Sequence, residues 1–229
     1  MSASTLPENF QDEDFSREGL YLFFTDGQCV RIVRDEIEKL SEEYWQDPHK
    51  IHPLIKELPE FLPCGHCPHY GEQVFCIALR PILPYLNSVD QYMSYDRVTA
   101  VFSAGGTGEV SVSETSTQQA LKYVAILSLI FYCEMGERYR GYFADVNPLM
   151  SPDEISTILH RNIRRRKADH PADLTQEMAT FEKEVMESAQ CLTKRLRLIC
   201  RNDAFINAFS NAQLALQMLL LHNETDRTA

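Results

Sequence analysis

The chain has 229 residues, of which 44% are apolar and 24% are charged, and its formal net charge is −11. This length allows one large domain or two small ones, and the apolar fraction is sufficient for a substantial core. The negative charge argues against non-specific binding to DNA or to an anionic membrane surface. We therefore expect neither nucleic acid nor a membrane among the partners of this protein.

The sequence predicts a cytoplasmic location. Residues 1–14 are polar and acidic and lack the basic start and apolar stretch of a signal peptide. The most apolar run, residues 124–133, is shorter than the ~20 residues that a transmembrane helix needs. The seven cysteines are an odd number, which fits reduced thiols or metal-bound thiolates better than a disulfide framework.

Two β-hairpins are predicted in the first half of the chain. Residues 21–24 and 29–33 are apolar runs separated by an Asp-Gly turn, which is favoured because glycine accepts a positive φ. Residues 97–102 and 109–113 alternate apolar and polar side chains, and the glycine-rich stretch between them predicts a second turn. Neither Gly-Lys-Ser/Thr nor an immediate helix follows these glycines, so a phosphate-binding loop is the weaker interpretation.

Helices are predicted from residue 115 onward, preceded by a short amphipathic helix at residues 35–45. Residues 115–137 are strongly apolar and predict a central helix. The run Ser151-Pro152-Asp153-Glu154 is typical of a helix start, because serine caps, proline suits the first position and acids favour the first turn. We expect this helix to end near residue 167. Two further helices are predicted at residues 173–200 and 203–221.

The predicted helix at residues 173–200 carries one apolar stripe. Its members follow each other at spacings of three and four: Leu174, Met178, Phe181, Val185, Ala189, Leu192, Leu196 and Ile199. The stripe predicts either core packing within one domain or a coiled-coil seam in a homodimer. Ser188 and Arg195 interrupt a strict heptad, which favours core packing.

The order of elements predicts an α+β fold, with early antiparallel β-hairpins packed on a mostly helical C-terminal half. We expect a flexible acidic arm at residues 1–18, one domain at residues 19–222 and a tail at residues 223–229. Within the domain, residues 19–114 form a β-rich part that contains the cysteine cluster. Residues 115–222 form the helical part.

The strongest candidate site is the run of residues 64–76, Cys-Gly-His-Cys-Pro-His-Tyr-Gly-Glu-Gln-Val-Phe-Cys. Cys64 and Cys67 have the Cys-x-x-Cys spacing with which a tight turn places two thiolates on one tetrahedral zinc ion. Cys76 is the expected third ligand. The fourth is expected to be His69, with His66 and Cys133 as alternatives, and zinc is therefore the expected cofactor.

Two other interpretations of this run stay open. Cys64-Gly65-His66-Cys67 matches the motif of thiol-disulfide oxidoreductases, in which the first cysteine attacks and the second resolves the mixed disulfide. No strand and long helix flank the motif, as they do in thioredoxin-like enzymes, which weakens this hypothesis. The remaining interpretation is that reduced cysteines simply pack as small apolar residues.

Several motifs together resemble a family of uncharacterised bacterial proteins. The shared motifs are Cys-x-x-Cys-Pro with a third cysteine (Cys64, Cys67, Pro68, Cys76), Ser94-Tyr95 before a strand, Thr117-Gln118 before an apolar helix, and Asp-Ala-x-x-Asn-Ala at residues 203–208. The similarity spans most of the chain from about residue 20. The family pattern also has Gly-Cys-Pro at the end of the apolar helix, whereas here Cys133 lies about one turn earlier and no proline follows. The resemblance implies a fold grouping and carries no known activity.

The run from His160 to Lys167 is the one basic run of the chain. Arg161 and Arg165 are four residues apart on one helical face and are candidates for clamping a phosphate group. The alternative is that these charges only stabilise the C-terminal end of the helix dipole. Asp203 and Asn207 are also four residues apart. Asp203 is expected to cap a helix or to serve a partner.

No nucleophile elbow, zinc-protease motif, kinase motif or P-loop is present in the sequence. We therefore expect a non-enzymatic, cytosolic bacterial interaction or regulatory protein with a protein partner and a zinc knuckle. A thiol-disulfide oxidoreductase and a phosphate- or nucleotide-sensing module are the alternative hypotheses.

Overall fold

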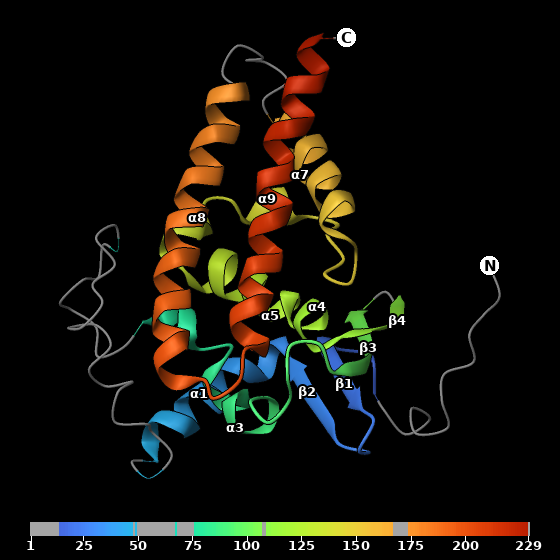
Figure 1. The fold of residues 1–229 in the computed structure, drawn as a ribbon, viewed down its shortest axis with the longest axis vertical. Helices are drawn as coiled ribbons and strands as arrows, with labels where there is room; N and C mark the ends of the chain where they lie inside the picture. The colour runs from blue at the N-terminus through green and yellow to red at the C-terminus, as the bar shows by residue number, and fades with distance from the viewer. Residues whose placement is uncertain are drawn as a thin grey trace.

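The computed structural model describes residues 14–47, 49, 67, 76–106, 109–166 and 174–228, with the side chains of the last helix described as far as Leu219. A four-stranded antiparallel sheet occupies the early part of the chain, and long helices make up the C-terminal half (Figure 1). This arrangement confirms the predicted α+β class.

The strands are β1 (Glu18–Phe24), β2 (Cys29–Val33), β3 (Arg97–Ala104) and β4 (Val110–Ser116), in the spatial order β2-β1-β3-β4. Every neighbouring pair is antiparallel, and Leu22 of β1 lies opposite both Val30 and Ala100. The two predicted hairpins are therefore confirmed, and β1 and β3 join them into one sheet.

Glycines shape both hairpin turns. Gly27 has φ 86°, and the Asp26 carboxylate accepts the N–H of Gln28 at 3.0 Å. At the end of β3, Gly105 has φ 70°, and a Cβ atom there would lie 2.8 Å from the backbone nitrogen of Glu18. Only glycine combines this conformation with this close approach. Gly105 and Gly106 thus turn the chain at the end of β3, as predicted.

The two faces of the sheet pack against apolar clusters of different size. Leu20, Leu22 and Phe24 of β1 point into the main core. The opposite face carries a small separate cluster of Tyr21, Val33 and Val101, against which Phe15 packs. The Tyr21 hydroxyl donates to the backbone oxygen of Asp14 at 2.8 Å. Residues 14–18 therefore belong to the folded part of the chain, although the sequence placed them in the flexible arm.

Short helical segments lie between the hairpins and beside the sheet. They are η2 (Arg34–Glu36), α1 (Ile37–Gln46), η3 (Ile77–Leu79), η4 (Leu83–Tyr85) and α3 (Leu86–Val89). Segment α1 corresponds to the short amphipathic helix predicted after β2, and it buries Ile37, Ser41 and Tyr44.

The predicted central helix at residues 115–137 is wrong in two respects. Its first residues complete β4, and the rest is divided into α4 (Thr117–Ala120), α5 (Lys122–Ile126), the π-helical segment η5 (Leu127–Tyr132) and α6 (Glu134–Glu137). The Cys133 N–H donates to the Ser128 carbonyl, five residues back, at 2.9 Å. The backbone then turns so tightly that a Cβ atom on Gly136 would lie 1.8 Å from the Leu129 carbonyl oxygen.

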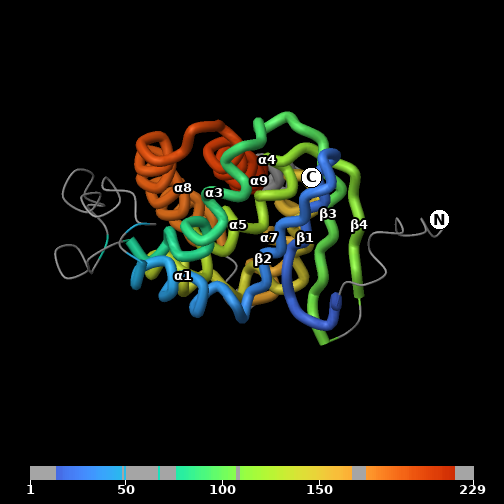
Figure 2. The backbone as a smooth tube through the Cα atoms, turned by 90° about the horizontal axis from the view of Figure 1, so that it is seen from below, coloured from blue at the N-terminus to red at the C-terminus, as the bar shows by residue number. Residues whose placement is uncertain are grey.

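The central position is instead held by the last helix, α9 (Ala204–Thr228). It packs against α7 (Pro152–Arg166), α8 (Leu174–Ile199), α4 and α5 (Figure 1). Seen along the perpendicular direction, α9 lies between α8 and the sheet (Figure 2). A short 3-10 segment, η6 (Arg140–Phe143), precedes α7.

The predicted starts and faces of the long helices are confirmed. Ser151 and Glu154 form a reciprocal capping box, with the Ser151 N–H donating to the Glu154 carboxylate at 2.8 Å and the Glu154 N–H donating to the Ser151 hydroxyl at 3.3 Å. On α8, every member of the predicted apolar stripe after Leu174 is buried within the chain. This is the core-packing interpretation of the stripe, so a homodimer would use another face of α8.

None of the described helices is both long and apolar enough to cross a membrane.

The core contains one buried lysine, Lys122, which is 1% exposed. Its ammonium donates to the backbone oxygen of Met150 and to the Gln119 side chain. Burial lowers the pKa of Lys122 to about 8, and the more distant charge of Glu154 acts in the opposite direction. The folded state therefore binds this proton less tightly than the unfolded state does.

We expect Lys122 to make unfolding pH-dependent on the alkaline side. Between about pH 8 and pH 10.5 the unfolded chain keeps this proton and the folded chain loses it, so its contribution to stability rises with pH. Buried cysteines and tyrosines also titrate in this pH range, but their contribution to stability falls as the pH rises. The wild type must therefore be compared with Lys122→Met, so that the effect of Lys122 is separated from theirs. The difference between their free energies of unfolding should shift by up to about 3 kcal/mol across this range. A constant difference would contradict the lowered pKa.

The inward face of α8 can be tested with two leucines of the same helix. Leu196 is fully buried, whereas Leu198 is 46% exposed. Leu196→Ala should lower the free energy of unfolding by about 2–5 kcal/mol, because it leaves a cavity in the core. Leu198→Ala should change it by less than about 0.5 kcal/mol. Similar losses in urea denaturation of the two variants would contradict the assignment of faces.

Candidate functional site

The structure describes two of the four expected zinc ligands. Cys67 and Cys76 are half-buried free thiols, whereas Cys64 and His69 lie outside the described residues, as does the alternative ligand His66. Cys133, the other alternative, is also half-buried. The question is therefore which side chains surround Cys67 and Cys76.

Cys76 and Cys133 come together although 57 positions separate them in the sequence. Segment η3 starts directly after Cys76 and packs against η5, which ends directly before Cys133. Cys76 lies close enough to Cys67, Cys133 and Arg195 for the charges of these groups to act on its thiol. Both Cys76 and Cys133 also pack against the main core.

Helix α8 forms the other wall of this region with Ser188, Cys191 and Arg195, which lie on one helical face at spacings of three and four. The Cys133 thiol donates to the Ser188 hydroxyl at an Sγ–Oγ distance of 3.7 Å. The Arg195 guanidinium donates to the Cys191 sulfur at 2.9 Å. We call Cys67, Cys76, Cys133, Cys191 and Arg195 the thiol cluster. Arg195 is linked to Cys191 and Cys76, and Cys76 lies within electrostatic range of Cys67 and Cys133.

The electrostatics of the thiol cluster are set by burial. Removal from water raises the pKa of Cys76 to about 11, and the nearby Arg195 charge offsets only part of this effect. Cys76 is therefore a neutral thiol at pH 7 and a weak nucleophile. A metal ion would displace its proton, because the thiolate is the form that binds metal.

The described cysteines do not complete a metal site. Among the residues that the structure describes, no three His, Cys, Asp or Glu side chains are close enough to hold one metal ion together. A complete ligand set therefore requires donors from residues 64–69. These residues offer thiolates and imidazoles, which are ligands that suit zinc.

Sequence reasoning missed Cys191 and Arg195 as members of this site. A signal was present, because Arg195 is a charged residue at a position where the apolar stripe of α8 faces inward, and it is only 4% exposed. Charged side chains are rarely buried without a specific partner. Cys191 is one helical turn before Arg195, on the same face.

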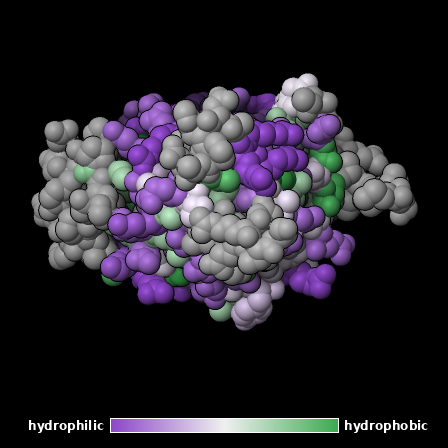
Figure 3. Space-filling view, turned by 90° about the horizontal axis from the view of Figure 1, so that it is seen from above, coloured by the Kyte–Doolittle hydropathy of each residue, from purple (hydrophilic) through white to green (hydrophobic). Residues whose placement is uncertain are grey.

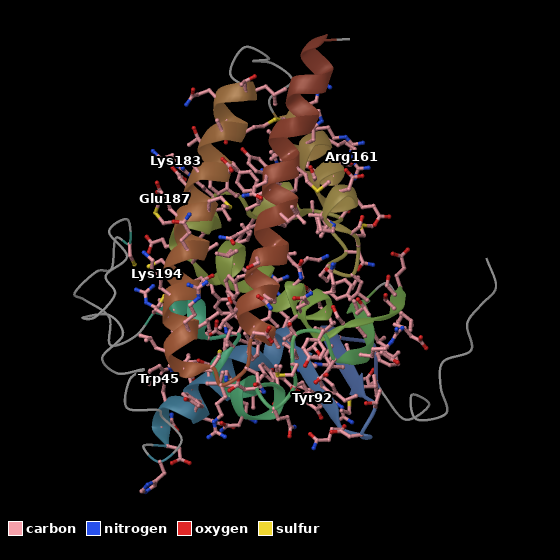
Figure 4. All side chains as sticks on the ribbon, viewed as in Figure 1. Trp45, Tyr92, Arg161, Lys183, Glu187 and Lys194 are labelled. Carbon is pink, nitrogen blue, oxygen red and sulfur yellow. The ribbon has the colours of Figure 1, made fainter. Side chains whose placement is uncertain are left out.

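Arg161 and Arg165, the candidate phosphate clamp, are both exposed and lie on α7. The end of the molecule seen from above is largely hydrophilic over its described surface (Figure 3). Arg161 lies on the outer side of α7, away from Lys183 and Lys194 on α8 (Figure 4). The pair is thus accessible, and neither Lys183 nor Lys194 of α8 lies beside Arg161 (Figure 4).

The motifs that carry the family resemblance meet at a second place. The Asp203 carboxylate accepts the Ser94 N–H and the Ser94 hydroxyl, both at 2.8 Å, and the Asn207 side-chain amide at 2.8 Å. The Gln118 N–H donates to the Ser94 carbonyl at 3.0 Å. We call Ser94, Asp203 and Asn207 the polar latch.

The polar latch explains why Asp203 directly precedes α9. Its side chain ties the start of this helix to the loop before β3, instead of serving an external partner. A second aspartate reinforces the connection, because Asp90 accepts the N–H groups of Arg201 and Asn202 at 2.6 and 3.0 Å. These contacts make the latch a structural feature that holds the sheet against the helical half.

Comparison of the chain with models of protein families, with curated proteins and with solved structures finds no match in any of the three. The family resemblance described above therefore stays a prediction.

The polar latch can be tested by a double-mutant cycle. Asp203→Ala should lower the free energy of unfolding by about 3 kcal/mol, because it leaves the buried Ser94 N–H without its acceptor. Ser94→Ala should cost about 1 kcal/mol. The double variant should lose less than the sum of the two, by about 1 kcal/mol, because one hydrogen bond is counted in both. Additive losses in chemical denaturation would show that the two residues do not interact.

Proposed function

We propose that this protein is a non-enzymatic, cytosolic interaction or regulatory protein whose cysteine segment, residues 64–76, forms a zinc knuckle anchored on α8. The observation that carries this proposal is the packing of η3, which follows Cys76, against η5, which precedes Cys133. The charges of Cys67 and Arg195 also act on the Cys76 thiol. Sequence-distant cysteines converge at the place where the cysteine segment joins the described fold.

Arg195 supports a metal centre on electrostatic grounds. A zinc ion with three thiolates and one imidazole has a net charge of −1, and with four thiolates it has −2. A buried negative centre is costly unless a positive group lies beside it. The Arg195 guanidinium supplies that charge from a rigid helix. Cys64, Cys67 and Cys76 with His69 are the proposed ligands, and His66 is the alternative fourth ligand. Cys133 is not among them, because no three described side chains are close enough to hold one metal ion.

The thiol-disulfide alternative has less support. Its reacting pair would be Cys64 and Cys67, and a reactive thiol needs an accessible position with a lowered pKa. The thiol of Cys76, which lies within electrostatic range of Cys67, has the opposite property, since burial raises its pKa to about 11. A zinc knuckle also agrees with an interaction function, because residues 64–76 would form an interaction surface when they bind the metal.

We expect protein purified in zinc-buffered medium to contain one zinc per chain, as measured by elemental mass spectrometry. Cys64→Ser and Cys76→Ser should lose the metal, whereas Cys29→Ser, which changes the exposed cysteine at the start of β2, should keep it. Removal of the metal by a chelator should lower the unfolding temperature of the wild type and leave Cys64→Ser unchanged.

Two results would contradict the proposal. Metal-free wild type with a Cys64–Cys67 pair that cycles between thiol and disulfide, and with turnover on thiol substrates, would establish the redox alternative. Metal-free wild type with inert thiols would show that the cysteines only pack. Zinc should be retained in Cys133→Ser, because Cys133 is not among the proposed ligands.

A further inference from the structure

An aromatic pocket that shares no residue with the thiol cluster lies between one end of the sheet and the loop that leads to α7. It has a volume of about 430 Å³, which is within the range of small-molecule sites. Four aromatic rings line it, contributed by Phe102, Tyr123, Phe131 and Phe143. Strand β3, helix α5, segment η5 and segment η6 each supply one ring.

The charges around the aromatic pocket are mainly negative. Glu18, Glu109, Asp145 and Arg34 are its charged lining residues, which sum to −2 among the described residues. Arg34 is largely occupied, because its guanidinium donates to both carboxylate oxygens of Glu18, at 2.8 and 2.9 Å. Its charged group also lies 4.3 Å from the centre of the Phe131 ring. The pocket therefore favours a cation over an anion.

One lining residue, Tyr123, has a buried hydroxyl group without a hydrogen-bond partner among the described residues. Tyr123 is only 4% exposed. This hydroxyl lies within electrostatic range of both Glu18 and Arg34, which line the same pocket. A buried hydroxyl without a partner is costly, and a ligand that hydrogen-bonds to it would remove that cost.

We propose that the aromatic pocket binds a small organic amine with an aromatic or aliphatic body. The rings enclose the body and interact with the positive charge through their π-faces. Asp145 and Glu109 attract the ammonium group, and the Tyr123 hydroxyl accepts one of its N–H bonds. The proposal is independent of the thiol cluster, because the two share no residue.

The first test uses phenethylamine as the probe, with phenethyl alcohol and 3-phenylpropionate as neutral and anionic analogues. Titration calorimetry and thermal unfolding of the full chain should show binding of the amine with Kd below about 1 mM. Both analogues should bind at least ten times more weakly. Equal binding of amine and alcohol would overturn the cation assignment, and absence of any amine binding at about 10 mM would overturn the site.

Matched variants test the individual residues. Asp145→Asn keeps a residue type that tolerates the observed φ of 64°, and it should weaken phenethylamine binding at least threefold. Glu42→Gln makes the same change of charge on the exposed face of α1 and should leave binding unchanged. Equal effects of the two variants would mean that only the overall charge of the protein attracts the amine.

Tyr123→Phe separates a binding role from a structural role. Because the hydroxyl has no hydrogen-bond partner within the part of the chain that the structure describes, its removal should leave the unfolding temperature of the ligand-free protein unchanged or raise it. The same variant should weaken amine binding at least threefold and reduce the thermal stabilisation that the amine provides. Unchanged amine affinity in Tyr123→Phe would overturn the role given to this residue.

Discussion

The packing around α9 is the constraint on which the rest of the structure depends. Ala204, Ala208, Ala212 and Ala215 are buried at spacings of four, four and three, with phenylalanines and leucines between them. Small side chains let neighbouring helices approach closely, and a helix that is apolar on most of its circumference has to be enclosed. Helices α7 and α8, together with α4 and α5, provide that enclosure.

The position of α9 also determines how the two halves of the molecule meet. The polar latch binds the first turn of α9 to the loop before β3, and Asp90 binds the turn between α8 and α9. These are charge-assisted hydrogen bonds to partly buried backbone groups, which are stronger than neutral ones and require a defined geometry. The sheet is therefore held at a fixed place on the helical half.

Local patterns were sufficient to predict the strands and the long helices. The Asp-Gly turn, the apolar stripe of α8 and the Ser151 capping box are each determined by neighbours in the sequence, so periodicity and capping rules identify them. The break between η5 and α6 was missed because no proline or adjacent glycine pair marks it. It depends on the close approach of Gly136 to the Leu129 carbonyl, which only the folded structure displays.

The candidate site likewise has one part that the sequence predicts and another that only the folded structure displays. The Cys-x-x-Cys spacing is local and was visible in the sequence, whereas Cys191 and Arg195 join the cluster only through the packing of α8. The tyrosine, aromatic rings and carboxylates of the aromatic pocket come from at least five elements, so no sequence motif could have indicated them. Convergence of distant residues is a product of topology, and single-sequence reasoning has no access to it.

Segment η5 connects the two proposed sites physically. Phe131, within η5, lines the aromatic pocket and lies beneath the Arg34 guanidinium, and Cys133, two residues later, belongs to the thiol cluster. The π-helical bond from Cys133 to Ser128 fixes both residues in one short backbone segment, and such segments are frequent at functional sites. Coupling between sites requires an element whose position both can influence. In this chain η5 is the described element that meets this requirement, because it supplies a ring to one site and ends at a thiol of the other.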